Sequence, residues 1–372
     1  MGGEQQPSIL LTADTVGGVW TYAVELARAL GPFGIDVHLA TMGGPLRAHQ
    51  RDELDRLPHV SLHESRFALE WMPDPWREVD AAADWLLALE RRWQPQLVHL
   101  NQFAFGALPF AAPTLLVAHS CVPSWWRAVH GTRAPAGWDG YRGRVAAGLR
   151  GAGLVAAPTA AMLAALRAEH GFHGEAVVLP NGRDPALFPI GAKEPFVFAA
   201  GRFWDEAKNL AALQAVAPRL PWPVCVAGSC VHPDGRELRP AGVQALGELA
   251  PREVAAHMAC ASIYALPAYY EPFGLSVLEA ALSGCALVLG DIASLREVWG
   301  DAAVYVKPDD TLALHEVLQQ LIARPDPRSR LAAAAHRRAL RFSPRAMAEA
   351  WFAAAARLAP ALAGRPEELP CA

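Results

Sequence analysis

Lysine is scarce in this sequence: only three of its 33 basic residues are lysine, at positions 193, 208 and 307, and the rest are arginine. With 37 acidic residues, the formal net charge is -4. Nucleic acid binding needs a dense field of basic side chains, so this balance excludes a nucleic acid as the main partner. Because lysine is so rare in this chain, the position of each lysine helps to identify candidate functional residues.

Paired cysteines and long apolar runs are also missing. The six cysteines include no C-x-x-C pair, which excludes a zinc ribbon and a disulfide framework. No run approaches the ~18 apolar residues of a membrane-spanning helix. The polar residues 1–7 lack the basic start of a signal peptide. We therefore expect a chain in reducing, cytoplasmic surroundings, with at most peripheral membrane contact.

The common nucleotide-binding motifs are absent as well. There is no Gly-Lys pair for a Walker loop and no D-x-D metal-binding motif. Residues 151–156 match G-x-G-x-x-A, but they precede a predicted strand, whereas a pyrophosphate turn follows one. We expect no cofactor and no metal ion.

Length and periodicity predict an α/β chain with two domains. A chain of 372 residues exceeds what one hydrophobic core usually supports, and 52% hydrophobic residues suffice for two. Short apolar runs alternate with amphipathic stretches, which indicates parallel sheets with helical crossovers. In the first half we expect helices at 19–30 and 80–93, and strands at Ser8–Ala13, Asp36–Thr41, Leu97–Leu100, Thr114–Ala118, Leu154–Ala157 and Ala176–Leu179.

A cluster of Pro, Gly and Asp at residues 180–191 predicts the linker between the domains. We expect domains over 1–185 and 190–342, with a last helix at about 343–362 that packs back on the first. Two doubly wound sheets would bind a ligand in the cleft between their carboxyl edges. In the second half the expected helices are 210–216, 253–260 and 275–282, and the expected strands are Phe196–Ala200, Val224–Ala227, Ile263–Leu266, Ala286–Leu289 and Val304–Val306.

Two glycines, Gly17 and Gly18, stand between the first predicted strand and the helix that follows it. Glycine lets the backbone approach a ligand closely, and the start of a helix presents unpaired N–H groups to a phosphate or sugar oxygen. An ordinary tight turn is the alternative interpretation.

Arg202 and Lys208 fall on one short loop directly after the first strand of the second half. Together they supply two positive charges for a diphosphate at a carboxyl edge. A solvated surface pair is the alternative, but Lys208 is one of three lysines in the chain.

Glu271 and Glu279 flank a predicted helix start in the run EPFGLSVLE. The N–H groups of Gly274, Leu275 and Ser276 would carry a fractional positive charge suited to a phosphate. Glu279 could accept hydrogen bonds from ribose hydroxyls and Glu271 from a sugar hydroxyl. Stabilisation of the helix dipole is an alternative for Glu271, but not for an acid at 279 within an apolar run.

Together, these motifs resemble the retaining glycosyltransferases of family 4, which have the GT-B fold: two Rossmann-like doubly wound domains facing across a cleft. The likeness runs from Gly17 to about residue 360. Each motif alone is weak, whereas their order and spacing are specific. The matching segments are Gly17–Gly18, Asn181–Asp184, Gly201–Arg202 with Lys208–Asn209, Glu271–Leu275 with Glu279, and the runs 296–298 and 300–303.

The resemblance implies roles for these residues. Arg202 and Lys208 would hold the donor diphosphate, and Gly17–Gly18 would close on it from the first domain. His119, which follows a predicted strand, matches the family histidine that contacts the donor sugar near the scissile bond. The implied catalytic residues are His119, Glu271, Arg202 and Lys208, and the implied donor-binding residues are Gly17, Gly18, Arg202, Lys208, Glu271, Phe273, Gly274, Leu275, Ser276 and Glu279.

The resemblance also implies the reaction. A hexose would move with retention, and without a metal ion, from a UDP-glucose-like or GDP-mannose-like donor to a sugar, lipid-linked or small-molecule acceptor. The leaving diphosphate would take the acceptor's proton. A GT-B nucleotide-sugar epimerase and a non-catalytic two-domain binding protein remain alternatives. The first should lack the spacing from Arg202 to Lys208, and the second would need no convergent cationic loop.

Acceptor contacts are predicted for Trp20, Tyr22, Trp125 and Trp126. Flat aromatic faces suit sugar rings and apolar acceptors, and these four rings follow either the glycine pair or His119. Core packing is the alternative for the two adjacent tryptophans. The sequence leaves the donor base, the acceptor, the linkage and the oligomeric state open.

Overall fold

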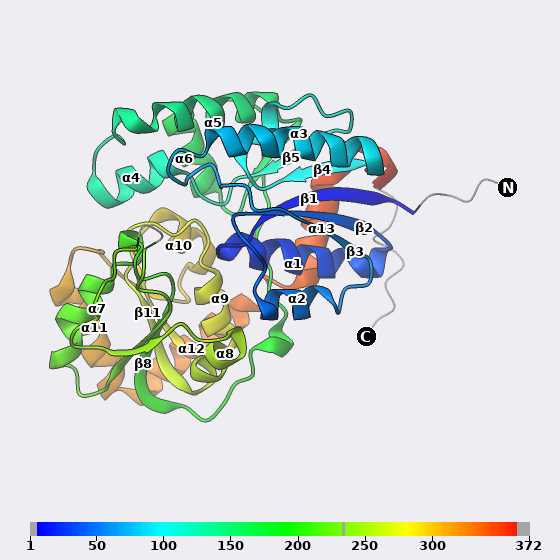
Figure 1. Cartoon of the computed structure of the whole chain (residues 1–372). Helices are drawn as coiled ribbons and strands as arrows, with labels where there is room; N and C mark the ends of the chain where they lie inside the picture. Colours follow the sequence, from blue (N-terminus) through cyan, green and yellow to red (C-terminus); the bar gives the residue numbers. More distant parts are fainter. Residues whose placement is uncertain (1–5, 233–234, 363–372) are drawn as a thin grey trace. The chain divides into compact units, whose positions relative to one another are not determined.

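The structure, a computed structural model, describes residues 6–232 and 235–362. The chain folds as two compact units (Figure 1). Unit 1 comprises Met1–Ser124, Arg133–Gly182 and Pro344–Ala372, and unit 2 comprises Trp125–Thr132 and Arg183–Ser343. Two segments thus depart from the sequential order, residues 125–132 and the last helix.

Unit 1 is built on a seven-stranded parallel sheet with the order β3-β2-β1-β4-β5-β6-β7. The central strands are almost wholly buried apolar runs, as expected for a sheet covered on both faces. The strands are β1 (Ser8–Asp14), β2 (Asp36–Met42), β3 (Val60–Glu64), β4 (Leu97–Leu100), β5 (Thr114–Val117), β6 (Leu154–Ala157) and β7 (Ala176–Val178).

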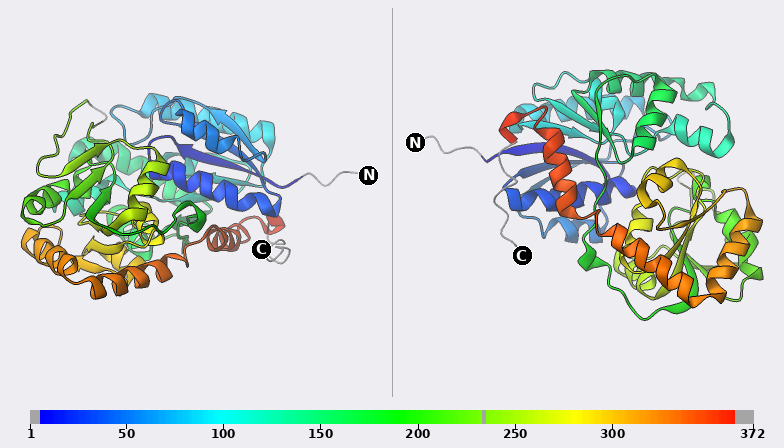
Figure 2. Two further views of the ribbon diagram at one scale, coloured as in Figure 1. Left: turned by 90° about the horizontal axis from the view of Figure 1, so that it is seen from below. Right: turned by 180° about the vertical axis from the view of Figure 1, so that it is seen from behind.

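The helices of unit 1 include one from the end of the chain. This helix, α13 (Pro344–Ala355), packs against α1 (Gly18–Leu30) (Figure 2). The rings of Phe33 and Phe352 meet with centroids 4.8 Å apart. The other helices are α2 (Ala48–Leu54), α3 (Trp76–Trp93), α4 (Val122–His130), of which residues 125–130 belong to unit 2, α5 (Asp139–Gly151) and α6 (Ala160–His170).

Unit 2 holds a six-stranded parallel sheet with the order β10-β9-β8-β11-β12-β13. Its strands are β8 (Glu194–Ala200), β9 (Val224–Ala227), β10 (Gln244–Gly247), β11 (Ala261–Leu266), β12 (Ala286–Gly290) and β13 (Val304–Val306). Its further helices are α7 (Leu210–Val216), α8 (Pro251–Cys260), α9 (Leu275–Leu282), α10 (Ala293–Trp299), α11 (Thr311–Ala323) and α12 (Pro325–Ala339).

The predicted α/β class with two parallel-sheet domains is confirmed, but two strands were missed. Both β3 and β10 lie at an edge of their sheet, and both are short and partly exposed. An edge strand pairs on one side only, so it needs no continuous apolar run. The predicted last helix at 343–362 is shorter than expected, since α13 ends at Ala355 and a single 3₁₀ turn follows at Pro360–Leu362.

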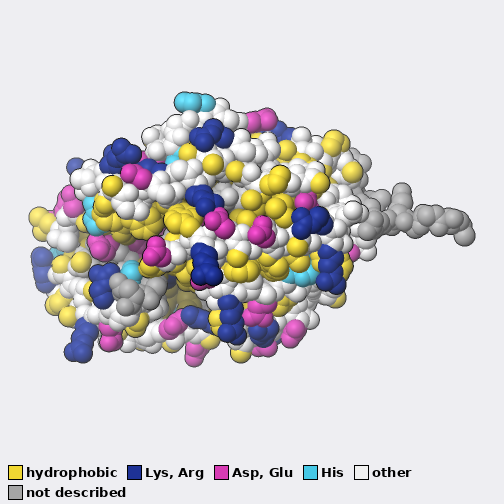
Figure 3. Space-filling model, turned by 45° about the horizontal axis from the view of Figure 1, so that its top comes forward, with side chains coloured by type: hydrophobic (Ala, Val, Ile, Leu, Met, Phe, Trp, Pro, Cys, Tyr) yellow, Lys and Arg dark blue, Asp and Glu magenta, His cyan; other side chains and the backbone are white. Residues whose placement is uncertain are grey.

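Charges of both signs are interspersed on the face that Figure 3 shows, where Lys and Arg alternate with Asp and Glu. Within the described ranges, no helix combines the length and apolar character needed to cross a membrane.

Candidate functional site

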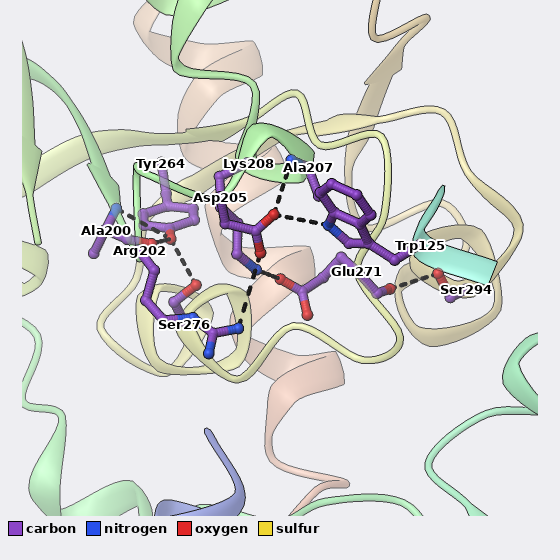
Figure 4. Close-up of polar contacts among 10 residues, drawn as sticks. All are labelled: Trp125, Ala200, Arg202, Asp205, Ala207, Lys208, Tyr264, Glu271, Ser276 and Ser294. Carbon is purple, nitrogen blue, oxygen red and sulfur yellow. Dashed lines mark hydrogen bonds and ion pairs between the residues drawn. The ribbon is translucent and has the colours of Figure 1, made fainter. Parts of the chain in front are cut away.

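The cationic loop of unit 2 follows β8 at the carboxyl edge of the sheet (Figure 4). A carboxylate organises it: Asp205 Oδ1 accepts a hydrogen bond from the Ala207 backbone N–H at 3.0 Å, and Asp205 Oδ2 lies 3.9 Å from an Arg202 guanidinium nitrogen. The Arg202 side chain is 42% exposed, so its charge reaches solvent. Asn209, in the left-handed conformation, then caps the N-terminus of α7, because its side chain accepts a hydrogen bond from the Ala212 N–H.

Lys208 and Glu271 form an ion pair at 2.5 Å. Their loops come from β8 and β11, which are neighbours in the sheet, so residues far apart in the sequence meet at one edge. The side chains are only 15% and 12% exposed, respectively. The Ser294 hydroxyl donates to the Glu271 carbonyl at 2.6 Å and holds the acidic loop from α10. Two of the predicted site residues are thus in direct contact.

A close backbone approach supports the start of the cationic loop. Gly228, just beyond β9, has φ of +139°, and a Cβ at this position would lie 1.8 Å from the Gly201 carbonyl oxygen. The loop after β9 also receives a hydrogen bond from the Phe203 N–H, at the Ser229 carbonyl. No larger residue fits at Gly228 without moving the loop that carries Arg202.

Helix α9 begins at Leu275, where the sequence predicted a helix start. Gly274 precedes the helix with φ of +91°, a conformation that side chains rarely adopt. Leu275 and Ser276 are partly exposed. Phe273 is 2% exposed and its ring packs on Phe342 at 5.4 Å. The predicted donor-binding role is therefore wrong for the side chain of Phe273, which packs in the core of unit 2.

Tyr264 links the cationic loop to the start of α9 (Figure 4). Its hydroxyl lies 2.8 Å from Ser276 Oγ and donates to the Ala200 carbonyl at 3.0 Å. Ala200 directly precedes Gly201 and Arg202. Burial raises the pKa of Tyr264 far above its usual value of 10, so the hydroxyl keeps its proton. One buried side chain therefore joins the cationic loop to the start of α9.

Glu279 lies on α9 and forms an ion pair with Arg183, 3.0 Å from its guanidinium Nε. Both side chains are largely buried, at 17% and 12% exposure. The Arg183 guanidinium also lies over the ring of Phe188, 5.0 Å from its centroid. The sequence motif at 181–184 contained Arg183, but no role was predicted for it.

Trp125 and Trp126 were expected to bind an acceptor from the first domain. They belong to unit 2, and the Trp125 indole N–H donates to Asp205 Oδ1 at 2.8 Å (Figure 4). Trp125 therefore supports the acid that organises the cationic loop. Trp126 packs against His130, with ring centroids 4.5 Å apart. Both rings are partly exposed, and their acceptor role stays a prediction.

In unit 1 the glycine pair and His119 lie at the same edge of the sheet. Gly17 and Gly18 are exposed between β1 and α1, and Gly17 has φ of 130°. His119 follows β5, and β4 lies between β1 and β5. Asn101, just beyond β4, connects the two, because it hydrogen-bonds both Thr12 on β1 and His119.

These contacts determine the tautomer of His119. Asn101 Nδ2 donates to the Thr12 carbonyl at 2.5 Å, and a carbonyl can only accept, so the amide orientation is fixed. Asn101 Oδ1 then accepts from His119 Nε2 at 2.8 Å, which leaves Nδ1 as the acceptor nitrogen. Burial lowers the pKa of His119 to about 3. The imidazole is therefore neutral at pH 7.

A second buried histidine lies behind the first. His99 Nδ1 accepts a hydrogen bond from the Trp351 indole at 2.9 Å, and His99 Nε2 lies 3.4 Å from the Tyr22 hydroxyl. The Tyr22 ring packs edge-on against His119 at 4.4 Å. Burial, reinforced by His119, lowers the pKa of His99 to about 3.

Trp20 and Tyr22 do not face an acceptor, which corrects that prediction. Both belong to the core of unit 1, with exposures of 4% and 1%. The Trp20 indole N–H donates to Glu53 at 2.8 Å. Their place after the glycine pair suggested binding, but on α1 they point into the core instead.

The structure thus brings together Arg202, Lys208, Glu271 and Ser276 in unit 2, and separately the glycine pair with His119 in unit 1. Three supporting residues, Asn101, Tyr264 and Asp205, were missed. Asn101 directly follows a predicted strand, and Asp205 lies between Arg202 and Lys208 in the predicted cationic loop. These positions could have indicated both residues. Within the described residues, no group of three or more His, Cys, Asp or Glu side chains is arranged to hold a metal ion.

Two family profiles match the sequence. "Glycosyltransferase Family 4" matches residues 16–187, and "Glycosyl transferases group 1" matches residues 194–324. Glycogen synthase of Mycobacterium tuberculosis is 32% identical over 184 residues, which is 44% of this chain and 44% of the relative. The match thus spans less than half the length of this relative.

Solved structures of two further proteins are similar in fold. Sucrose-phosphate synthase from Thermosynechococcus elongatus superposes with a TM-score of 0.79 at 20% identity, covering 96% of this chain and 100% of that one. Anabaena HepE, in complex with UDP and glucose, has a TM-score of 0.71 at 16% identity, with coverages of 95% and 100%. At these identities the likeness shows the fold, which is GT-B.

Proposed function

Because the chain belongs to the glycosyltransferases of family 4, we propose that it moves a hexose, with retention and without a metal ion, from a nucleoside diphosphate sugar to an acceptor hydroxyl. The observation that carries this proposal is the ion pair between Lys208 and Glu271, beside Arg202 and the start of α9. It puts two cations, a carboxylate and helix N–H groups at one sheet edge.

This arrangement suits a sugar diphosphate. Arg202, Lys208 and the N–H groups of Leu275 and Ser276 would stabilise the negative charge that develops on the leaving diphosphate. Glu271 would accept hydrogen bonds from hydroxyls of the transferred sugar, and it also keeps Lys208 in place before the donor binds. Stabilisation directed at the leaving group favours the transition state over the bound donor, which is what raises the rate.

In the proposed reaction, the bond from the anomeric carbon to the phosphate oxygen breaks. The acceptor oxygen bonds to the same face of that carbon, and its proton moves to the departing phosphate oxygen. No charged base is needed. His119 fits this balance because a neutral imidazole offers hydrogen bonds to a sugar without bringing a positive charge. Glu279, held by Arg183, would bind the ribose.

The donor is proposed as a uridine or guanosine diphosphate hexose. HepE has also been solved in complex with UDP-glucose, which makes a uridine donor the first to try. A panel of both donor types, with and without chelator, should give slow release of a nucleoside diphosphate that the chelator does not reduce. The anomeric proton of the product, observed by NMR, reports retention or inversion.

Lysine substitutions give a matched comparison. We expect Lys208→Met to reduce donor turnover at least about 100-fold, whereas Lys307→Met, at an exposed lysine, should leave turnover unchanged. Thermal unfolding of both variants shows whether the effect is one of folding. Equal turnover of Lys208→Met and wild type at saturating donor would overturn the assignment, as would interconversion of donor sugars without release of a diphosphate.

A further inference from the structure

A pocket of about 180 Å³ opens in unit 1 between the loop after β3 and the start of α5. It is smaller than the roughly 300 to 1,000 Å³ of a site for a drug-sized ligand, and so suits one small ring. Neither Glu70 nor any other lining residue was singled out by the sequence motifs. The lining residues are Glu70, Met72, Pro73, Asp74, Pro75, Trp76, Gly137, Trp138 and Tyr141.

The pocket lies at the same sheet edge as His119. Glu70 accepts hydrogen bonds from the N–H groups of Phe103 at 3.1 Å and Ala104 at 2.8 Å, in the turn that begins two residues after Asn101. Nearby charges agree with this placement, because Asp14 contributes to a raised pKa of Glu70 and Glu70 to that of Cys121, two residues after His119. A ring bound in the pocket would therefore lie at the edge of the unit 1 sheet that carries His119.

Aromatic side chains form much of the pocket wall. Trp76 and Trp138 are partly exposed, and the Trp138 ring meets the Tyr141 ring at 5.8 Å in an edge-on arrangement. Rigid aromatic walls combined with a few placed acceptors are how proteins hold a ring that has apolar faces and a rim of hydroxyls.

Two carboxyl groups supply the acceptors. Glu70 is 7% exposed. Asp74 is exposed and has φ of +47°, which is unusual for a residue other than glycine. Two other described residues share this conformation, Gln94 and Asn209, but each of them caps a helix. The strained backbone at Asp74 thus coincides with the pocket, which is typical of a binding site.

The charge of the pocket selects among ligands. Among the described residues that line it, none is Lys or Arg. The guanidinium of Arg144 lies over the Trp76 ring at 5.4 Å, but Arg144 is paired with Asp80 at 2.7 Å. A phosphate group entering beside the carboxylate of Asp74 and the carboxyl group of Glu70 would meet no neutralising cation among the described lining residues, which disfavours it electrostatically.

We propose that this pocket holds one ring of a neutral, hydroxyl-rich acceptor and disfavours acceptors that carry a phosphate. The inference rests on the proposed glycosyl transfer and names the acceptor class for it. The hydroxyls would donate to Glu70 and Asp74, while the apolar face of the ring would pack on Trp76 or Trp138.

Saturation-transfer NMR on the full chain, without donor, tests the binding directly with glucose, fructose and their 6-phosphates as probes. We expect signals from at least one neutral sugar and signals at least about fivefold weaker from its 6-phosphate. Trp138→Ala should reduce the sugar signal about fivefold or more, whereas Trp222→Ala, at a tryptophan of unit 2, should not. Asp74→Asn keeps a residue that tolerates positive φ and should strengthen the 6-phosphate signal relative to wild type.

Two results would overturn the proposal: 6-phosphates that bind wild type as well as the neutral sugars do, or no sugar signal that depends on Trp138. Donor hydrolysis without acceptor separates this proposal from the proposed function. If Trp138→Ala hydrolyses donor at the wild-type rate but loses the sugar signal, the pocket assignment holds. If wild type hydrolyses no donor, the proposed function fails, while the binding result still decides the pocket.

Discussion

Asn101 holds the imidazole of His119 in the tautomer that carries its proton on Nε2. The amide can do so because its own orientation is fixed by the Thr12 carbonyl, which accepts from Nδ2 at 2.5 Å while Oδ1 accepts from His119 at 2.8 Å. A neutral ring with a defined acceptor nitrogen can receive a hydrogen bond from a sugar hydroxyl without repelling a developing positive charge.

Replacing the amide should release this control. In Asn101→Ala, the His119 ring loses the partner of Nε2, so both neutral tautomers should appear in the ¹⁵N spectrum of the ring. We expect a loss in kcat of about 10-fold and a loss of about 1 to 3 kcal/mol in the free energy of unfolding, because the Thr12 carbonyl also loses its donor. Rate measurements with His119→Ala and the double variant provide the control. If Asn101 acts through His119, its effect on kcat should largely vanish when His119 is already absent.

The buried histidines should make stability depend on pH. Folded His99 and His119 take up a proton only near pH 3, whereas an unfolded histidine does so near 6.5. Between these two pH values the unfolded chain therefore binds more protons than the folded one. As a result, these histidines lower the free energy of unfolding progressively as the pH falls from 6.5 toward 3, and they have no such effect above pH 6.5. Glu70, whose pKa is raised to about 7, opposes this trend between about pH 4.5 and 7.

Comparing wild type with a histidine variant cancels the contribution of Glu70, because both proteins contain that residue. In His99→Gln, urea unfolding at pH 5 and 6.5 should show a slope of stability against pH that is smaller than in wild type by about 1 kcal/mol per pH unit. His173→Gln, at an exposed histidine, is the matched control and should keep the wild-type slope. Equal slopes in wild type and His99→Gln would contradict the assignment of His99 as a buried neutral group.

Tyr264 should act on donor binding through position alone. Tyr264→Phe keeps the buried ring but removes the hydroxyl between Ala200 and Ser276. We expect the KM for donor to rise about 5- to 10-fold with a change in unfolding free energy of about 1 kcal/mol. Tyr305→Phe is a suitable control, since the Tyr305 hydroxyl also binds a backbone carbonyl of unit 2, that of Gly300 at 2.8 Å. A similar change in KM in both variants would show a general loss of stability instead of a positioning effect.

Lys193 should affect stability and not catalysis. Its ammonium donates to the carbonyls of Met258 at 3.2 Å, Ala259 at 2.8 Å and Ser283 at 2.6 Å, at the ends of α8 and α9. Positive charge at helix C-termini is favourable, although solvent around this lysine weakens the effect. We expect Lys193→Met to lower the unfolding free energy by about 1 to 2 kcal/mol with kcat unchanged, as measured by urea unfolding and donor turnover. A large loss of turnover without a loss of stability would contradict this role.

The sequence predicted the central strands well, because a strand buried on both faces must be a continuous apolar run, as in β1 and β11. It missed β3 and β10 because these edge strands are only five and four residues long and neither is a buried apolar run. The charged site residues could be predicted since Lys208 and Glu271 stand in short loops directly after strands. Which of them would pair could not, because that depends on β8 and β11 being neighbours.

Other features carried no usable signal in the sequence. Tyr264 sits inside the apolar run of β11, where an aromatic residue normally indicates packing only. Glu70 is a single acid in a loop, and its burial depends on two N–H groups more than 30 residues away. The opposite holds for Trp20 and Tyr22, whose sequence signal was incorrect. Their place beside the glycine pair suggested ligand binding, but both side chains lie on the face of α1 that packs into the core.

The position of α13 has a consequence for the order in which the protein can be completed during translation. All seven strands of the first sheet have been synthesised once Val178 is made, but Trp351, which donates to His99, lies 252 positions after that histidine in the sequence. The nascent first sheet must therefore wait, with one side of its core uncovered, until the whole second unit has emerged. A fragment ending near Gly182 would expose the surface that Phe352 and Trp351 cover, which makes it a natural substrate for chaperones and a poor candidate for separate expression.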